Sequence, residues 1–240
     1  MNKKLNNGKW KNFEEFIKVA NENCDWLVLR NFEYLPHNFF QNDKDVDILC
    51  KDIEKFVKVM GLKKRSWGVA SYEVIIENKV VPFDVRFLGD GYYDKLWQYK
   101  MLLNKIYTSE KVPRMNDTDY FYSLIYHSKL QKMEVKEIYI KRLYHLSALL
   151  KIPNFRSRSI LDDKYVAGIL SDFMESNRYT FSEPVDINIP KNNIFFRQVK
   201  AHIKKESNRK LKRIIYQYTP KLFLSFIPKR VKIVLKKLFF

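Results

Sequence analysis

The segment Asp45-Val46-Asp47-Ile48-Leu49-Cys50 constrains the fold of this chain more than any other segment does. Successive side chains of a β-strand point to opposite faces of a sheet. If the segment is a strand, Val46 and Ile48 enter an apolar core, while Asp45 and Asp47 project together from the other face. Two carboxylates in such positions repel each other unless a positive charge lies between them. A divalent cation is the usual solution, and oxygen ligands of this kind suit Mg²⁺.

A third carboxylate, Asp84, interrupts a second apolar segment at residues 80–88. If that segment is a strand beside the first, Asp84 joins Asp45 and Asp47 at one site. Three carboxylates on adjacent strands are typical of metal-dependent phosphoryl transfer. The alternative is that Asp43, Asp45 and Asp47 form an acidic turn that leads into a strand and binds no metal.

The first part of the chain carries the hydrophobic pattern of a compact α/β unit. We expect a helix at 10–20, a strand at 26–30, a loop at 31–42, a strand at 46–50, a helix at 52–60 and a hairpin with strands at 71–76 and 79–88. Gly61 is well placed to end the second helix. Glu77-Asn78 is the expected hairpin turn.

The second part of the chain changes character, because helical spacing replaces the alternating pattern. It predicts helices at 92–107, 118–132, 134–150 and 161–177, followed by a short extended piece at 185–190. The expected fold class is therefore α/β (α+β), with a small mixed sheet and flanking helices. The expected domains are an α/β core at 1–92, a helical subdomain at 93–190 and a basic amphipathic tail at 191–240.

The net charge of +18 is concentrated in this tail, where residues 191–240 contain 15 lysine and arginine residues and one acidic residue. Within 203–240, apolar residues alternate with lysine and arginine at near-helical spacing, which is typical of a helix lying on an anionic membrane surface. Binding to nucleic acid is a second interpretation. A helix that packs on the body of the protein with a solvated basic face is a third.

The remaining composition argues for a globular cytoplasmic protein. No run of 18 apolar residues is present, and the segment 1–8 lacks the apolar region of a secretory signal. Cys24 and Cys50 provide neither a disulfide framework nor a zinc pattern. We expect a cytoplasmic location, peripheral at the inner face of the cell membrane if the tail binds lipid.

The motifs within residues 26–88 resemble those of the nucleotidyltransferase superfamily, the fold shared by polymerase-beta-like enzymes. Asp45 and Asp47 match the paired carboxylates of that family, and Asp84 matches its third. Where the family usually has Gly-Ser or Gly-Gly after the first strand, this chain has Leu29-Arg30-Asn31. A non-catalytic binding module of the same fold therefore remains an alternative.

The resemblance implies a role for each matched residue. Asp45 and Asp47 would hold Mg²⁺ or Mn²⁺, and Asp84 would bind a second metal or accept a proton from an acceptor hydroxyl. Arg30 is a candidate phosphate contact in place of the missing glycine turn. Arg86 is another, with an ion pair to Asp84 or Asp47 as its alternative role.

Two segments also resemble a branch of the superfamily that is found beside bacterial surface-polysaccharide genes: Leu29-Arg30-Asn31-Phe32-Glu33-Tyr34-Leu35-Pro36 and Gly89-Asp90-Gly91-Tyr92-Tyr93-Asp94. This branch implies a nucleotide or nucleotide-activated donor and a sugar, polyol or glycan acceptor.

Two further residues are weaker candidates for this site. His127 lies on a predicted helix and would contact phosphate or base, although such a histidine is more often a hydrogen-bonded core residue. Asp90 follows Asp84 closely, within Gly89-Asp90-Gly91, a sequence that favours a turn over a phosphate cradle.

Overall fold

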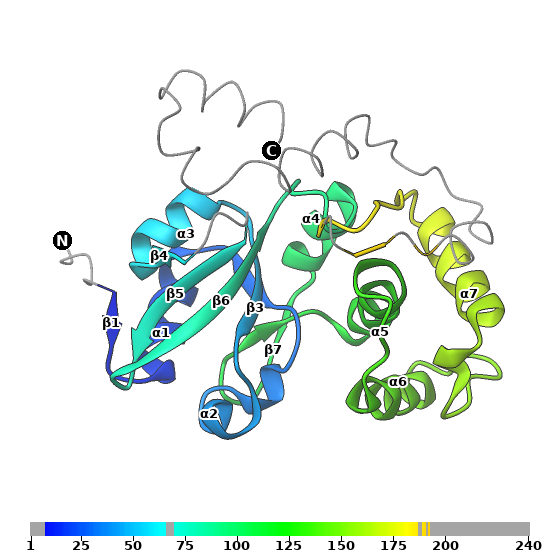
Figure 1. Ribbon diagram of the computed structural model, residues 1–240, viewed down its shortest axis with the longest axis horizontal. Helices are drawn as coiled ribbons and strands as arrows, with labels where there is room; N and C mark the ends of the chain where they lie inside the picture. Colours follow the sequence, from blue (N-terminus) through cyan, green and yellow to red (C-terminus); the bar gives the residue numbers. More distant parts are fainter. Residues whose placement is uncertain (1–7, 66–69, 187–188, 191, 193–240) are drawn as a thin grey trace, which may run out of the picture. The chain divides into compact units, whose positions relative to one another are not determined.

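The computed structural model describes residues 8–65, 70–186, 189–190 and 192. The chain divides into two compact units, Met1–Phe121 and Tyr122–Phe240. The first unit contains a mixed sheet with flanking helices, and the second contains mainly helices (Figure 1). The expected mixed α/β class is therefore confirmed.

The sheet of the first unit has eight strands within the described residues, in the order β1-β5-β6-β3-β2-β8-β7, with β4 paired to β5. The strands are β1 (Lys9–Trp10), β2 (Trp26–Val28), β3 (Val46–Cys50), β4 (Lys63–Lys64), β5 (Ser71–Ile76), β6 (Lys79–Phe87), β7 (Ile106–Tyr107) and β8 (Pro113–Arg114). The pairs β1–β5, β3–β6 and β2–β8 are parallel, and the other pairs are antiparallel. The sheet thus includes two short strands that lie beyond residue 92.

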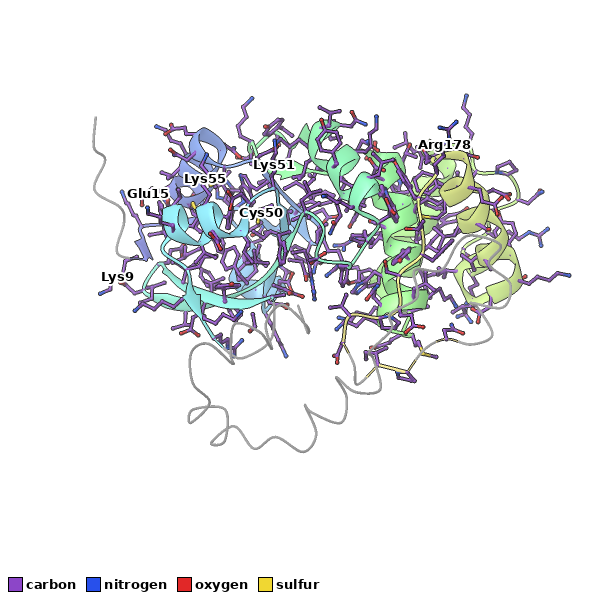
Figure 2. All side chains as sticks on the ribbon, turned by 90° about the horizontal axis from the view of Figure 1, so that it is seen from above. Lys9, Glu15, Cys50, Lys51, Lys55 and Arg178 are labelled. Carbon is purple, nitrogen blue, oxygen red and sulfur yellow. The ribbon has the colours of Figure 1, made fainter. Side chains whose placement is uncertain are left out.

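Helices α1 (Phe13–Asn23) and α3 (Ile53–Met60) cover one face of this sheet. Figure 2 shows Glu15 of α1 and Lys55 of α3 on the same side of the strands. Beneath the helices, aromatic rings form the core. The ring centroids of Phe16 in α1 and Phe83 in β6 are 5.1 Å apart, and those of Phe56 in α3 and Trp26 in β2 are 5.7 Å apart. Burial of such large rings is the main source of stability in a unit of this size.

The ends of α3 follow from its sequence, as expected. The Asp52 carboxylate accepts a hydrogen bond from the Lys55 amide at 2.9 Å and so caps the first turn. Gly61 ends the helix with a φ of 64°, in the left-handed region where a side chain is unfavourable. The helix therefore begins and ends where the sequence predicts.

The hairpin of β5 and β6 also forms as predicted, and its turn fixes which residues face the core. Glu77 and Asn78 have φ values of 52° and 60°, the paired left-handed conformations of a tight two-residue turn. Ile76 is consequently paired with Lys79, and Ser71 with Asp84.

The segment 31–42, which we expected to be a loop, contains two short helical turns. A 3-10 turn at Phe32–Tyr34 and the one-turn helix α2 (Phe39–Asn42) fold the segment back toward β3. Phe32 and Phe39 are buried, so their apolar side chains hold these turns against the unit. Helix α4 (Lys95–Leu103) is shorter than the expected helix at 92–107. Asp94 accepts hydrogen bonds from the amides of its first turn and sets its start, and Ile106–Tyr107 form strand β7 instead of its last turn.

The second unit is built mainly from α6 (Glu137–Leu149), α7 (Asp163–Ser176) and the end of α5 (Asp117–Tyr126), a helix that crosses the boundary between the units. A five-residue π-helical turn, His127–Gln131, continues α5. Tyr122 stacks on Phe173 of α7 with 3.9 Å between the ring centroids.

Candidate functional site

Strands β3 and β6 place two of the three predicted carboxylates side by side. The strands are parallel, and Asp47 is the direct partner of Asp84. Partners in a sheet project from the same face, so both carboxylates lie opposite the face that α1 and α3 cover. The neighbouring pair Ile48 and Val85 points the other way and is fully buried. The alternation read from the sequence is present in both strands.

Asp45 immediately precedes β3 and belongs to the same cluster. Its carboxylate forms no hydrogen bond or ion pair within the described part of the chain, and the residue is exposed. Partial burial and then the negative charges of Asp47, Asp43 and Asp84 nevertheless raise the pKa of Asp45 to about 6. Asp45 therefore lies close enough to the other carboxylates to be repelled by them.

Asp47 is engaged by a buried arginine. Arg30 is 5% exposed, and its guanidinium donates to both oxygens of Asp47, from Nη2 to Oδ1 at 2.6 Å and from Nε to Oδ2 at 3.2 Å. This fork geometry is the strongest form of an arginine–carboxylate pair. Arg30 follows β2, whose antiparallel pairing with β3 brings it beside Asp47.

The turn after Arg30 contains no glycine and is built around Asn31. Asn31 has a φ of 59°, in the left-handed region that asparagine tolerates better than other residues with a side chain. Its Nδ2 donates to Asp43 Oδ2 at 2.6 Å. The local backbone conformation is therefore reached here without glycine.

Asp84 is engaged by the second arginine of the cluster. Arg86 lies two residues further along β6 and donates from Nη2 to Asp84 Oδ2 at 3.1 Å. The guanidinium carbon lies 4.3 Å from the centroid of the Tyr92 ring, a cation–π distance. The ion pair that we considered as the alternative role of Arg86 is thus present.

Asp90 lies beside Arg86 at the other terminal nitrogen of its guanidinium, Nη1. Its side chain is 2% exposed, and its Oδ2 lies 4.0 Å from Arg86 Nη1. Asp90 Oδ1 accepts hydrogen bonds from the Tyr92 amide at 2.9 Å and from Gln98 Nε2 at 2.7 Å. Sequence reasoning ranked Asp90 low and missed Gln98, since an isolated glutamine on a helix carries no pattern.

The cluster holds more negative than positive groups. Four carboxylates, those of Asp45, Asp47, Asp84 and Asp90, interact electrostatically with the guanidinium groups of Arg30 or Arg86, and Asp43 adds a further negative charge beside Asp45. Burial raises the pKa of Asp84 and that of Asp90, although Arg86 lowers both. Burial alone lowers the pKa of Arg86, but the adjacent carboxylates, Asp84 first, outweigh it and raise that pKa.

The donor chemistry of this cluster fits a hard divalent cation. The groups offered are carboxylate oxygens, and the surplus of negative charge is of the kind that such a cation relieves. No ready-made site exists, however: among the described residues, no three His, Cys, Asp or Glu side chains are grouped so that they would hold a metal ion. The two arginines engage oxygens of Asp47 and Asp84 instead.

His127 lies in the second unit, at the start of the π-helical turn. It is 5% exposed and packs edge-on against Tyr139 of α6, with 5.9 Å between the ring centroids. Two residues on, Lys129 forms an ion pair with Asp163 of α7 at 2.6 Å. The surroundings of His127 are those of a packed core residue, and its proposed contact with phosphate or base stays a prediction.

The basic segment 203–240 lies outside the described residues, and so does almost all of the predicted tail at 191–240. Its binding to an anionic membrane or to nucleic acid therefore stays a prediction. Among the helices that the structure describes, none has both the length and the apolar character needed to cross a bilayer.

Comparison of the chain with protein families, with curated proteins and with solved structures gives no match in any of the three.

Proposed function

We propose that this chain is a Mg²⁺- or Mn²⁺-dependent nucleotidyl- or phosphoryltransferase with a nucleotidyltransferase-like core. The observation that carries the proposal is the parallel pairing of β3 and β6, which sets Asp47 beside Asp84, with Asp45 directly before β3. The expected substrates are a nucleotide or nucleotide-activated donor and a sugar, polyol or glycan acceptor in surface-polysaccharide assembly.

Asp45, Asp47 and Asp84 are the residues that would hold the metal. When bound, the metal would neutralise phosphate charge and polarise the bond that is broken. Asp45 is the natural first ligand, because its carboxylate is exposed and repelled by its neighbours. Asp47 and Asp84 would contribute oxygens that now accept hydrogen bonds from arginine.

The remaining catalytic work falls to groups that position the substrate and accept its proton. Arg30 and Arg86 present guanidinium groups beside the carboxylates, where each would orient a phosphate oxygen of the donor. Asp84 Oδ1 is the oxygen that Arg86 leaves unengaged, and it would accept the proton of the acceptor hydroxyl. Burial raises the pKa of Asp84, and a raised pKa makes a carboxylate a better base.

Calorimetry tests the proposal directly. Mn²⁺ or Mg²⁺ is titrated into the protein together with a panel of nucleotides and sugar nucleotides, for the wild type and for Asp45→Asn. Asp25→Asn is the matched control, because it removes a carboxylate that pairs with Lys105 and lies outside the cluster. Metal-dependent nucleotide binding that is lost only in Asp45→Asn supports the proposal, whereas a folded wild type that binds no metal and no nucleotide refutes it.

A second candidate function is a non-catalytic binding module of the same fold. The bidentate pair between Arg30 and Asp47 favours it, since both oxygens of that carboxylate are engaged without a metal. The same titration separates the two functions, because a module of this kind would bind its nucleotide equally well with metal and with a chelator.

The tail gives an independent proposal about location and partners. We propose that 203–240 attaches the full chain to an anionic lipid surface, with nucleic acid as the less favoured partner. Sedimentation with phosphatidylglycerol vesicles tests this, with phosphatidylcholine vesicles and a DNA duplex as comparisons. Binding to duplex alone, weakened steeply by added salt, would reverse the preference.

A further inference from the structure

Arg86 lies between two carboxylates and makes a hydrogen bond to only one of them. Its Nη2 donates to Asp84 Oδ2 at 3.1 Å, while Nη1 stands 4.0 Å from Asp90 Oδ2, beyond hydrogen-bond distance. Asp90 Oδ2 and Arg86 Nε are both buried and have no hydrogen-bond partner. Buried polar atoms of charged groups are costly when they are left unpaired. The contact between Arg86 and Asp90 is thus incomplete, and a small movement of the guanidinium toward Asp90 would complete it.

The surroundings of Arg86 permit such a movement. The flat guanidinium lies against the face of the Tyr92 ring, a contact that survives sliding along the ring. Asp90 itself is fixed, because its Oδ1 accepts hydrogen bonds from the Tyr92 amide and from Gln98. Gln98 is in turn held by the Gly89 amide, which donates to its Oε1 at 2.7 Å. Asp90 is therefore a fixed hydrogen-bond acceptor on the buried side of Arg86.

The two carboxylates beside Arg86 differ in their exposure to solvent. The Asp84 side chain is 30% exposed and accessible to a cation from solvent, whereas that of Asp90 is 2% exposed. A metal ion that arrives at Asp84 would meet the positive charge of Arg86 on the same carboxylate. The two cations repel each other, so the guanidinium gains from moving toward the buried carboxylate.

We propose that Arg86 is a movable counter-ion, which neutralises Asp84 in the metal-free protein and moves to Asp90 when a divalent cation binds Asp84. This inference rests on the proposed function. It assigns Asp90 a positioning role, since Asp90 acts on the metal site only through Arg86. Arg30 differs, because its guanidinium makes two hydrogen bonds to a single carboxylate, that of Asp47.

The first test measures Mn²⁺ affinity by electron paramagnetic resonance of the free ion in wild type and Asp90→Asn. Asparagine keeps Oδ1 for the Tyr92 amide and Gln98 but presents an amide instead of a charge to Arg86. We expect Mn²⁺ to bind about 10- to 100-fold more weakly, as for other outer-shell partners of metal ligands. Asp25→Asn, the control for a lost carboxylate, is expected to bind Mn²⁺ like the wild type.

The second test asks whether Asp90 acts through Arg86. In the double variant Arg86→Gln/Asp90→Asn no buried carboxylate is orphaned, and the competing cation is gone. We expect Mn²⁺ to bind this variant at least as tightly as it binds the wild type. A loss of affinity as large as that of Asp90→Asn alone would overturn the inference.

The third test needs no metal. In a crystal structure of Asp84→Asn, Arg86 is expected to move until one of its nitrogens lies within hydrogen-bond distance of Asp90 Oδ2. An Arg86 that stays in place overturns the inference. If the folded wild type binds no Mn²⁺, both the proposed function and this inference fail, whereas tight binding that Asp90→Asn leaves unchanged overturns the inference alone.

Discussion

The two faces of strands β3 and β6 carry opposite kinds of interaction, although they are made by alternate residues of the same segments. On the face under α1 and α3, Ile48 and Val85 are fully buried and Phe83 is 2% exposed. On the other face, Asp47 and Asp84 are 14% and 30% exposed and each is paired with an arginine. The first face therefore carries only apolar side chains at these positions, whereas the second carries paired charges beside the buried side chain of Leu49.

The comparison teaches that the charged face is the one that can be rearranged. The buried side chains under the helices have no alternative partners, since closely packed rings fit together in one arrangement. Ion pairs on the opposite face have alternatives, because a metal ion, a phosphate or another carboxylate can replace either partner. Substitutions on the two faces should accordingly change the free energy of unfolding by different amounts, and these changes should differ in their dependence on pH and metal.

The largest change in the free energy of unfolding is expected from a substitution on the helix-covered face. Phe83→Ala removes a ring that is 2% exposed and packs on Phe16, so the free energy of unfolding should fall by about 3–5 kcal/mol. Val80→Ala is the control on the same strand, because Val80 is 61% exposed and its truncation should change stability by less than about 0.5 kcal/mol. Urea unfolding measures both, and equal losses would show that the two faces do not differ as described.

A smaller loss is expected from breaking the buried pair of the charged face. Asp47→Ala leaves the Arg30 guanidinium, 5% exposed, without its bidentate partner, and should cost about 3 kcal/mol of unfolding free energy. In the double variant Arg30→Met/Asp47→Leu no charge is left uncompensated, so most of that stability should return. If the double variant is as unstable as the single one, packing rather than charge dominates this pair.

The strands and their faces were predictable from the sequence because a period of two extends over several residues. Every second side chain is apolar from Val46 to Cys50 in β3 and from Val81 to Phe87 in β6, and this alternation places Asp47 and Asp84 on the opposite face. The end of α3 was equally predictable, since Gly61 has a local role that needs no tertiary partner.

What the sequence did not reveal depends on contacts between distant segments. The strands β7 and β8 have two residues each, too few for any period to be visible. The pairing of Arg30 with Asp47 is set by where β2 meets β3, and that register becomes known only when the strands are paired. Asp90 was ranked low because its partners, Arg86 and Gln98, come from a strand and a helix.

The charged face should also respond to pH, through Asp45. Partial burial and the charges of Asp47, Asp43 and Asp84 raise the pKa of Asp45 from 3.8 to about 6, so the folded protein holds this proton more tightly than the unfolded chain. The contribution of Asp45 to stability therefore falls as pH rises from 3.8 to about 6, and it stays unfavourable above that window.

Asp45→Asn removes this repulsion and should raise the free energy of unfolding of the metal-free protein modestly above the pH window from 3.8 to about 6. This increase should be smaller than the decreases predicted for Phe83→Ala and Asp47→Ala. Below the window the two proteins should have the same stability, because Asp45 is then protonated. Denaturant unfolding across pH measures the difference, with Asp25→Asn as the control. A stabilisation that does not depend on pH would contradict the electrostatic origin.

The smallest effect concerns the hairpin turn, which decides which residue reaches which face. A slip of one residue between β5 and β6 would turn Asp84 into the core and Phe83 out of it. Glu77 and Asn78 hold the register with φ values of 52° and 60°. Asn78→Gly keeps this left-handed conformation without strain and should raise the free energy of unfolding by about 0.5 kcal/mol.

Asn78→Ala provides the opposite test at the same position, because alanine tolerates a positive φ less well than asparagine. It should lower the free energy of unfolding by about 1 kcal/mol. If the turn sets the register, the glycine and alanine variants change stability in opposite directions, and amide exchange across the Ser71–Asp84 pair slows in the first and quickens in the second. Changes of the same sign in both variants would show that the buried side chains under α1 and α3 fix the register by themselves, and that the turn merely follows.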